Sequence, residues 1–461
     1  MGNIFVTENV RALPIVPVIH PKFKEWIKAQ AQETVNWVRA NRFLAKSGTM
    51  CFVPKKNGQL AKVLLGVDSV DDFWAFGSLP QKLPAGNYWL DAAGWKNSQL
   101  QKAAIAWGLG CYQFGKYKTH PVLGAKLKLM SKYNHRYIKN IVDTTFLVRD
   151  LINTPAEDMA PQKLSLAIAQ VARRFRAKVK NTVGAALRKN YPAVYAVGKS
   201  SHNAPCLIEL CWGNTQHPKV VLVGKGVCFD SGGLDLKPPA AMVHMKKDMA
   251  GAANALGVAI LIMAEKLPMR VHLIIPAVEN LVSSHSYKVG DVIYTRKKKT
   301  IEVTNTDAEG RIVLADALTL ASEQKPALIV DFATLTGAAT VALGAEIPAL
   351  FSNDTKIAQQ FLRIAAQEKE PVWHMPLYPP YREKLDSKIA DLKNSAAGSF
   401  GGAITAALFL QEFVTPKIPW LHFDIESMNY KSKPGRPEGG EAVLLQTMFE
   451  YLRNCYTKPC K

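Results

Sequence analysis

Two short stretches of the chain gather residue types that can hold metal ions and activate water. Between them they supply four carboxylates, two lysines and one arginine, namely Asp230, Asp248, Asp307, Glu309, Lys225, Lys237 and Arg311. Carboxylate oxygens are the ligands that hard divalent cations prefer, and a neighbouring arginine suits an anion or a substrate. The pattern therefore predicts a two-metal hydrolytic site.

The downstream stretch carries its charged residues at a spacing of two. Asp307, Glu309 and Arg311 follow the strand-like segment 301–303 and precede a helical pattern that we expect to begin at Ile312. In an extended chain, residues two apart point to the same side, so all three side chains would face one ligand. Taken alone, the motif also fits an ordinary surface loop.

The upstream stretch follows an apolar run, 219–223, that predicts a buried strand. This strand would deliver Lys225 and Asp230 into a glycine-rich loop, and Asp248 would lie at the start of the next helix. By itself, Asp248 reads as a helix cap. No H-E-x-x-H or Cys/His zinc pattern is present, so oxygen atoms would have to hold any metal, and His244, His374 and His422 are expected to be surface or core residues.

The composition is that of a folded chain of two or three domains. The 461 residues are 48% hydrophobic and 21% charged, which is enough apolar surface to offset the entropy of ordering. No apolar run approaches the ~20 residues of a bilayer span, and the start of the chain shows no export signal, so we expect a cytoplasmic protein without membrane contact. The seven cysteines form no C-x-x-C pair, which favours reduced thiols.

The alternation of strand and helix patterns predicts an α/β fold in two parts. Residues 1–125 are interpreted as a small N-terminal α/β domain with a structural or assembly role, 126–145 as a linker helix region, and 146–461 as the catalytic domain. The catalytic domain is expected to have a mainly parallel central sheet with helices on both faces. Its predicted strands are 193–197, 206–212, 219–223, 271–276, 327–333 and 420–425, and its predicted helices are 161–178, 250–266, 312–323, 356–368 and 402–413. In such a sheet, ligands collect beyond the carboxyl ends of the strands.

From about residue 153 onward the chain resembles the leucyl aminopeptidases, also called cytosol aminopeptidases, which are two-metal exopeptidases. The segments that carry the resemblance are 223–226, 229–237, 305–311, 331–337 and 401–407. The resemblance implies an active metallo-exopeptidase with two divalent ions per subunit, Mn²⁺ or Zn²⁺ foremost. It also implies a homohexamer.

The resemblance further implies a role for each polar residue. Asp230 and Glu309 would bridge the two metals, Asp307 would complete the looser site, and Lys225 with Asp248 would complete the tighter one. A hydroxide activated by both metals would attack the peptide bond. Lys237 would polarise the scissile carbonyl, and Arg311 would hold a hydrogencarbonate ion as the proton shuttle.

Substrate recognition is implied in the same way. Asp248 would bind the free α-amine, the Leu335 carbonyl would accept a hydrogen bond, and Met245, Thr334 and Gly337 would line an apolar pocket that suits leucine. Glu426 departs from the small residue usual in the family, and a carboxylate there would favour basic or small polar side chains. A one-residue alignment shift would instead put Glu426 at the rim.

The net charge of +21 leaves a second class of function open. Basic clusters such as 296–299 attract polyanions, so binding of DNA is an alternative or additional role, although a solvated basic surface that keeps the chain soluble is the simpler explanation. No nucleic-acid-binding motif supports specific recognition. A hexamer would repeat the 296–299 cluster six times and strengthen weak phosphate contacts through avidity.

Overall fold

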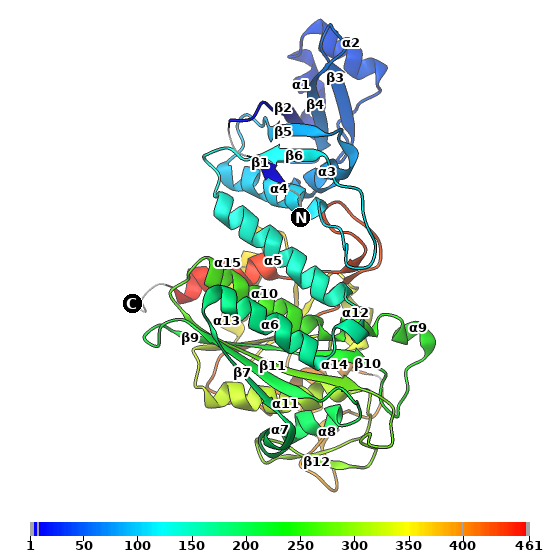
Figure 1. Ribbon diagram of the computed structural model, residues 1–461, viewed down its shortest axis with the longest axis vertical. Helices are drawn as coiled ribbons and strands as arrows, with labels where there is room; N and C mark the ends of the chain where they lie inside the picture. The colour runs from blue at the N-terminus through cyan, green and yellow to red at the C-terminus, as the bar shows by residue number, and fades with distance from the viewer. Residues whose placement is uncertain (1–3, 7–8, 399, 458–461) are drawn as a thin grey trace. The chain divides into compact units, whose positions relative to one another are not determined.

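The computed structural model describes residues 4–6, 9–398 and 400–457 (Figure 1). The chain divides into two compact units, the first comprising residues 1–146 and 430–438 and the second residues 147–429 and 439–461. The boundary between the two units, after Phe146, falls within helix α5 (His135–Asn153). Both units contain helices and strands, which confirms the predicted α/β class.

The first unit is built on a six-stranded sheet in the order β1-β6-β5-β2-β4-β3. All neighbouring strands are parallel except the antiparallel pair β3 and β4. The strands are β1 (Phe5–Val6), β2 (Leu13–Ile19), β3 (Met50–Pro54), β4 (Leu60–Val67), β5 (Gly86–Leu90) and β6 (Ala125–Lys128), and the helices before α5 are α1 (Phe23–Lys28), α2 (Gln32–Ala40), α3 (Leu79–Lys82) and α4 (Asn97–Gly110). The apolar end of β4 is fully buried, as expected for a strand inside a mostly parallel sheet.

The second unit is built on a nine-stranded sheet. Its main path runs β16-β15-β18-β14-β9-β11-β8-β7, and β10 pairs with the far half of β11. The central strands β18, β14, β9 and β11 are parallel, whereas β8 with β11, β7 with β8 and β15 with β18 are antiparallel. The strands are β7 (Lys178–Val183), β8 (Cys206–Trp212), β9 (Lys219–Gly224), β10 (Gly226–Asp230), β11 (Arg270–Asn280), β14 (Leu328–Ala333), β15 (Ala349–Ser352), β16 (Trp373–His374) and β18 (Trp420–Asp424).

Helices cover both faces of this sheet (Figure 1). Helix α10 packs on β9, β11 and β14 together with α6, α13 and α15, and α8 and α11 cover the opposite face. The helices are α6 (Pro161–Phe175), α7 (Gly184–Asn190), α8 (Pro192–Gly198), α9 (Pro239–Met242), α10 (Ala250–Ala264), α11 (Glu309–Glu323), α12 (Gly337–Leu343), α13 (Thr355–Glu368), α14 (Gly402–Gln411) and α15 (Leu445–Tyr456). Two small sheets complete the unit, one formed by β12 (Val292–Tyr294), β13 (Thr300–Glu302) and β17 (Leu392–Lys393), the other by β19 (Met428–Asn429) and β20 (Gly439–Gly440).

One predicted strand is wrong. Residues 193–197 lie in helix α8, whose first residue is Pro192. Proline favours the first position of a helix because its φ is already helical and its missing N–H needs no partner there. The next two N–H groups, of Ala193 and Val194, donate to the carboxylate of Asp316 at 2.9 and 3.3 Å. A helix cap supplied from a distant segment therefore overrides the strand-like composition.

The segment Met245–Ala264 is long and apolar enough to cross a membrane by length and composition. In the fold, however, 94% of its most apolar window is buried, because it contains α10 at the centre of the second unit. It serves as a core helix. The six cysteines among the described residues form no disulfide, and Cys460 lies outside those residues.

Candidate active site

The candidate site lies where neighbouring strands of the large sheet end. Gly224, the last residue of β9, pairs with Phe332 of β14, and Ala333, the last residue of β14, pairs with Asp424 of β18. The segments that follow these strands therefore start side by side. They carry Lys225, Thr334, Leu335 and Glu426, so sheet register brings together residues that are far apart in the sequence.

Lys225 occupies the single-residue break between β9 and β10 rather than a long loop. Its backbone N–H donates to the carbonyl of Phe332 at 3.0 Å, which ties the break to β14. Its ammonium lies 2.9 Å from Asp248 Oδ1 and 2.8 Å from Glu309 Oε1, and it donates to the carbonyl of Thr334 at 2.7 Å. The lysine thus joins the two stretches that the sequence singled out.

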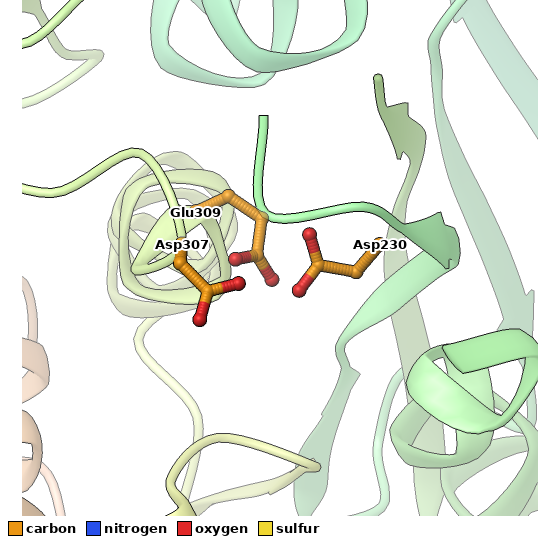
Figure 2. A group of neighbouring side chains, drawn as sticks. All are labelled: Asp230, Asp307 and Glu309. Carbon is orange, nitrogen blue, oxygen red and sulfur yellow. The ribbon is translucent and has the colours of Figure 1, made fainter. Parts of the chain in front are cut away.

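Three carboxylates converge beside this lysine. Asp230, Asp307 and Glu309 each offer an oxygen within 4.8 Å of the others, and Figure 2 shows their side chains turned toward a common space. Lys237 pairs with two of the three, at 2.9 Å from Asp230 Oδ2 and in direct contact with Asp307 Oδ1. Asp230 and Glu309 are buried, whereas Asp307 is partly exposed.

Asp230 is the last residue of β10 and is not in a loop, which corrects the sequence interpretation. Its Oδ1 accepts hydrogen bonds from Asn280 Nδ2 at 2.8 Å and from the N–H of Gly232 at 2.9 Å. Asn280, at the end of the paired strand β11, also donates to the carbonyl of Thr306 at 3.1 Å. One amide therefore fixes Asp230 relative to the backbone just before Asp307.

Glu309 and Arg311 lie on helix α11, which begins at Glu309 and not at Ile312. The prediction that Asp307, Glu309 and Arg311 share one side of an extended segment is therefore wrong. Their convergence has another cause, because Glu309 in the first turn of α11 projects toward Asp230 while Asp307 still precedes the helix (Figure 2). A carboxylate in a first helical turn is also favoured by the helix dipole.

Asp248 does not act as a helix cap. It lies in a 3₁₀ turn, Met245–Met249, before α10, whose N-cap residue Met249 makes no side-chain cap. Its Oδ1 accepts from Lys225 and from the Thr334 hydroxyl, the latter at 2.6 Å. Among the described residues, its other oxygen, Oδ2, is buried and has no hydrogen-bond partner. The carboxylate is held at one oxygen and available at the other.

These side chains open into a cavity of about 400 Å³ within the second unit. The structure brings all twelve predicted site residues to this place. Eleven line the cavity, namely Lys225, Asp230, Lys237, Met245, Asp248, Asp307, Arg311, Thr334, Leu335, Gly337 and Glu426. Glu309 is buried against Lys225.

The electrostatics of the cluster fit a cation. Burial alone would lower the pKa of Lys225, but the charges of Asp248, Glu309 and Asp230 raise it above its ordinary value. Burial, reinforced by Asp230, raises the pKa of Glu309 well above its ordinary value. Buried like charges are costly unless positive charge lies among them, and here two ammonium groups supply it. Together with the available Oδ2 of Asp248, this donor set suits divalent ions held mainly by oxygen.

Arg311 lies in the cavity wall on the α11 side. Its Nη1 donates to the carbonyl of Asn394 at 2.8 Å, and among the described residues its buried Nε has no hydrogen-bond partner. Burial lowers the pKa of Arg311 to about 10, against the opposing effect of Asp424 and Glu309. A buried guanidinium with an unused donor suits a small anion.

Two residues that the sequence interpretation missed also shape the cavity. Asp424, the last residue of β18, accepts hydrogen bonds from the backbone N–H groups of Leu335 and Thr336 at 3.0 and 3.2 Å and so fixes the chain after β14. Lys247, one residue before Asp248, lines the cavity and pairs with Glu426. The only sequence signal was a lysine next to Asp248, and its partner Glu426 lies too far along the chain to be inferred.

Residues that were set aside as non-ligands lie elsewhere. His422 is fully buried and bonds to Asp331 at 2.6 Å, as a core histidine. In the basic run 296–299, Arg296 pairs with Glu323, Lys299 pairs with Glu412, and Lys297 donates to the carbonyl of Glu412. Much of this positive charge is therefore already engaged within the chain.

Comparison with known families assigns both parts of the chain. The profile described as cytosol aminopeptidase family, catalytic domain, matches residues 146–449, and the profile of the M17 aminopeptidase N-terminal domain matches residues 13–130. A probable cytosol aminopeptidase from Rhodopirellula baltica is 47% identical over 269 residues, which cover 58% of this chain and 53% of the relative. The chain thus spans about half the length of that relative.

Solved structures match nearly the whole chain. The crystal structure of a cytosol aminopeptidase from Coxiella burnetii superimposes with a TM-score of 0.95 at 48% identity, covering 98% of this chain and 99% of that one. The bottromycin maturation enzyme BotP in complex with Mn superimposes with a TM-score of 0.87 at 31% identity, covering 96% and 99% of the two chains.

Proposed function

The chain belongs to the cytosol aminopeptidase family, and from that membership we propose that it is a metal-dependent aminopeptidase that releases N-terminal residues, leucine-like ones in particular, from peptides. One observation carries the proposal. Asp230, Asp307 and Glu309 converge beside Lys225 and Lys237, and all of these except Glu309 line a cavity large enough for an amino-acid residue.

Two divalent ions would be held by five side chains. Asp230 and Glu309 are assigned to both ions, Asp307 to one ion, and Lys225 with Asp248 to the other. When bound, the ions supply Lewis acidity that activates water and polarises the scissile carbonyl. Lys225 can serve as a ligand only after losing its proton, which its burial favours and the neighbouring carboxylates oppose. The positive charge of the ions would have to outweigh the effect of the carboxylates and lower the pKa of Lys225 enough for the proton to leave.

The remaining polar groups act on the peptide. Asp248, whose Oδ2 is available, would accept a hydrogen bond from the free α-amine of the substrate, which restricts cleavage to the first residue. Lys237, anchored by Asp230 and Asp307, lies where negative charge develops on the carbonyl oxygen and stabilises it. The carbonyl of Leu335 would accept a hydrogen bond from the attacking water or the leaving amine.

Arg311 is assigned to hold a hydrogencarbonate ion. Its guanidinium is buried and faces the cavity, with a donor that no described residue uses. A bound hydrogencarbonate there would pass the proton from water to the leaving amine. Among the described residues, no histidine lines the cavity to do this instead. Met245, Thr334 and Gly337 form the part of the wall that receives the first side chain.

Four finer points complete the proposal. Manganese or zinc is the metal pair, with manganese supported by the Mn complex of the relative BotP. A cytoplasmic location follows the names of the relatives. A homohexamer follows the family resemblance, and polyanion binding as an additional role rests on the net charge of +21. Light scattering would give the subunit number, and salt-sensitive retardation of duplex DNA would reveal polyanion binding.

The main proposal is tested by hydrolysis of leucine p-nitroanilide. Activity should disappear with a chelator and return with Mn²⁺ or Zn²⁺. Lys237→Ala should lower it at least about 10²-fold and Glu309→Ala should abolish it, while the circular dichroism spectrum stays unchanged. Full activity in either folded variant, or activity that survives complete metal removal, would overturn the assignment.

A further inference from the structure

An ion pair is built into the wall of the cavity. Lys247 in the 3₁₀ turn before α10 pairs with Glu426, which follows β18. Their side chains are only 8% and 11% exposed, and both line the cavity together with Met245 and Thr334. The second carboxylate oxygen of Glu426 accepts a hydrogen bond from the Thr340 hydroxyl of α12 at 3.1 Å. Three separate elements thus hold the pair in place.

The pair changes what Glu426 alone would do. An uncompensated carboxylate in a small cavity attracts a cationic side chain, because a buried charge without a partner is costly. Here Lys247 is that partner. A cationic N-terminal side chain would have to displace a lysine already held close by, and an anionic one would have to displace Glu426. Either exchange leaves a charge of the chain itself buried without compensation.

We propose that Lys247 and Glu426 together determine the side-chain preference of this cavity, as a mutually neutralising pair that admits uncharged N-terminal residues and rejects both arginine or lysine and aspartate or glutamate. The proposal rests on the aminopeptidase activity proposed above and specifies its substrate class. Lys247 is the specificity-determining residue that removes the basic preference expected from Glu426 alone.

The test compares kcat/KM for arginyl, glutamyl and leucyl p-nitroanilides at pH 7. The wild type should favour the leucyl substrate over both charged ones. Lys247→Met keeps the length of the side chain but removes its charge, so Glu426 remains buried without a partner. The arginyl-to-leucyl ratio should then rise about tenfold or more. Glu426→Gln should shift the ratios the other way, raising glutamyl over leucyl. The double variant should return both ratios to within about threefold of the wild type, since neither charge remains.

Lys246→Met is the matched control. The adjacent Lys246 does not line the cavity, and its ammonium donates instead to the carbonyl of Asn153 at 2.7 Å. Its ratios should equal those of the wild type. Should Lys247→Met fail to fold, Lys247→Gln, whose amide still donates to Glu426, should raise the arginyl-to-leucyl ratio in the same direction.

Two results would overturn the proposal. The first is an arginyl-to-leucyl ratio that Lys247→Met or Lys247→Gln leaves unchanged. The second is a double variant whose arginyl-to-leucyl or glutamyl-to-leucyl ratio stays about tenfold or more from the wild-type value, although neither charge remains. Calorimetric binding of argininamide and leucinamide to the metal-loaded protein gives the same ratio without turnover. If no variant hydrolyses any substrate, the proposed activity fails, while this binding ratio still decides for or against the pair.

Discussion

The ammonium nitrogen of Lys225 lies 2.8 Å from Oε1 of Glu309, where a strand break meets the first turn of a helix. The same nitrogen is 2.9 Å from Asp248 Oδ1, so one ammonium group pairs with two carboxylates of the site. An amine can bind a metal only in its neutral form, so metal binding would expel a proton if Lys225 is a ligand as proposed. The protonation state of Lys225 would therefore differ between the metal-free and the metal-loaded site.

Titration with Mn²⁺ should therefore release protons. Calorimetry in two buffers of different ionisation enthalpy should show a release near pH 7, and metal affinity should rise with pH. Lys225→Met should bind metal more weakly and without that release. Lys219→Met is the control. Lys219 is the first residue of β9, the strand that ends just before Lys225, and it donates to the carbonyl of Gln324. An identical proton release in Lys225→Met would contradict the assignment of Lys225 as a ligand.

Replacing Lys237 by methionine should separate metal binding from turnover. Lys237 contacts Asp230 and Asp307 but is assigned to the substrate carbonyl. We expect kcat to fall about 10²- to 10³-fold, as for loss of one donor that stabilises developing negative charge. Metal affinity, measured by calorimetry, should be kept or increased because a competing cation is gone. A variant with wild-type kcat would remove Lys237 from the mechanism.

Gly310→Ala should damage the site without destabilising the fold. A Cβ at Gly310 would lie 2.6 Å from Cε and 2.8 Å from Nζ of Lys225, so the lysine must move. Alanine also favours the helix by up to about 1 kcal/mol over glycine. Thermal unfolding should therefore stay the same or rise, while kcat/KM falls at least about tenfold. Gly115→Ala, where the nearest atom would be 3.9 Å away, should change neither quantity.

Stability should depend on pH through His272. Burial by itself lowers the pKa of this histidine, but hydrogen bonds with Cys211 and with Glu209, at 3.0 Å, raise it from 6.5 to about 9. A raised histidine pKa means that its contribution is complete below pH 6.5 and is lost as pH rises through 9. At about 1.4 kcal/mol per pKa unit, the free energy of unfolding should drop by roughly 3 kcal/mol over that range. Urea unfolding at several pH values measures the drop, and His272→Gln should flatten the curve.

The strands that position the site could be predicted because their composition and their environment agree. Strand β8 occupies the predicted range 206–212, and β9 and β18 each differ from their predicted ranges by one residue. These segments are mostly apolar, with few polar residues such as Glu209 and His422, which is close to the pattern expected of strands covered on both faces. The α/β class and the two-part organisation follow from the same signal.

Helix boundaries were less predictable where the sequence signal is not apolar. Helix α11 begins at Glu309 although its apolar residues begin at Ile312, because charged residues of the first turn face the site and not the core. Likewise, α8 depends on Asp316, more than a hundred residues away. The pairing of Lys247 with Glu426 is of the same kind. Contacts between distant segments carry no local pattern.

The burial of α10 has a consequence for the thermal inactivation of the protein. Every residue of this helix from Ala250 to Met263 is buried, and the helix starts two residues after Asp248. A segment enclosed in this way cannot open by local fraying, so its opening requires much of the second unit to unfold. Heat inactivation should therefore proceed at the global unfolding rate of that unit. The rate at which activity is lost on heating would then measure the kinetic stability of the second unit.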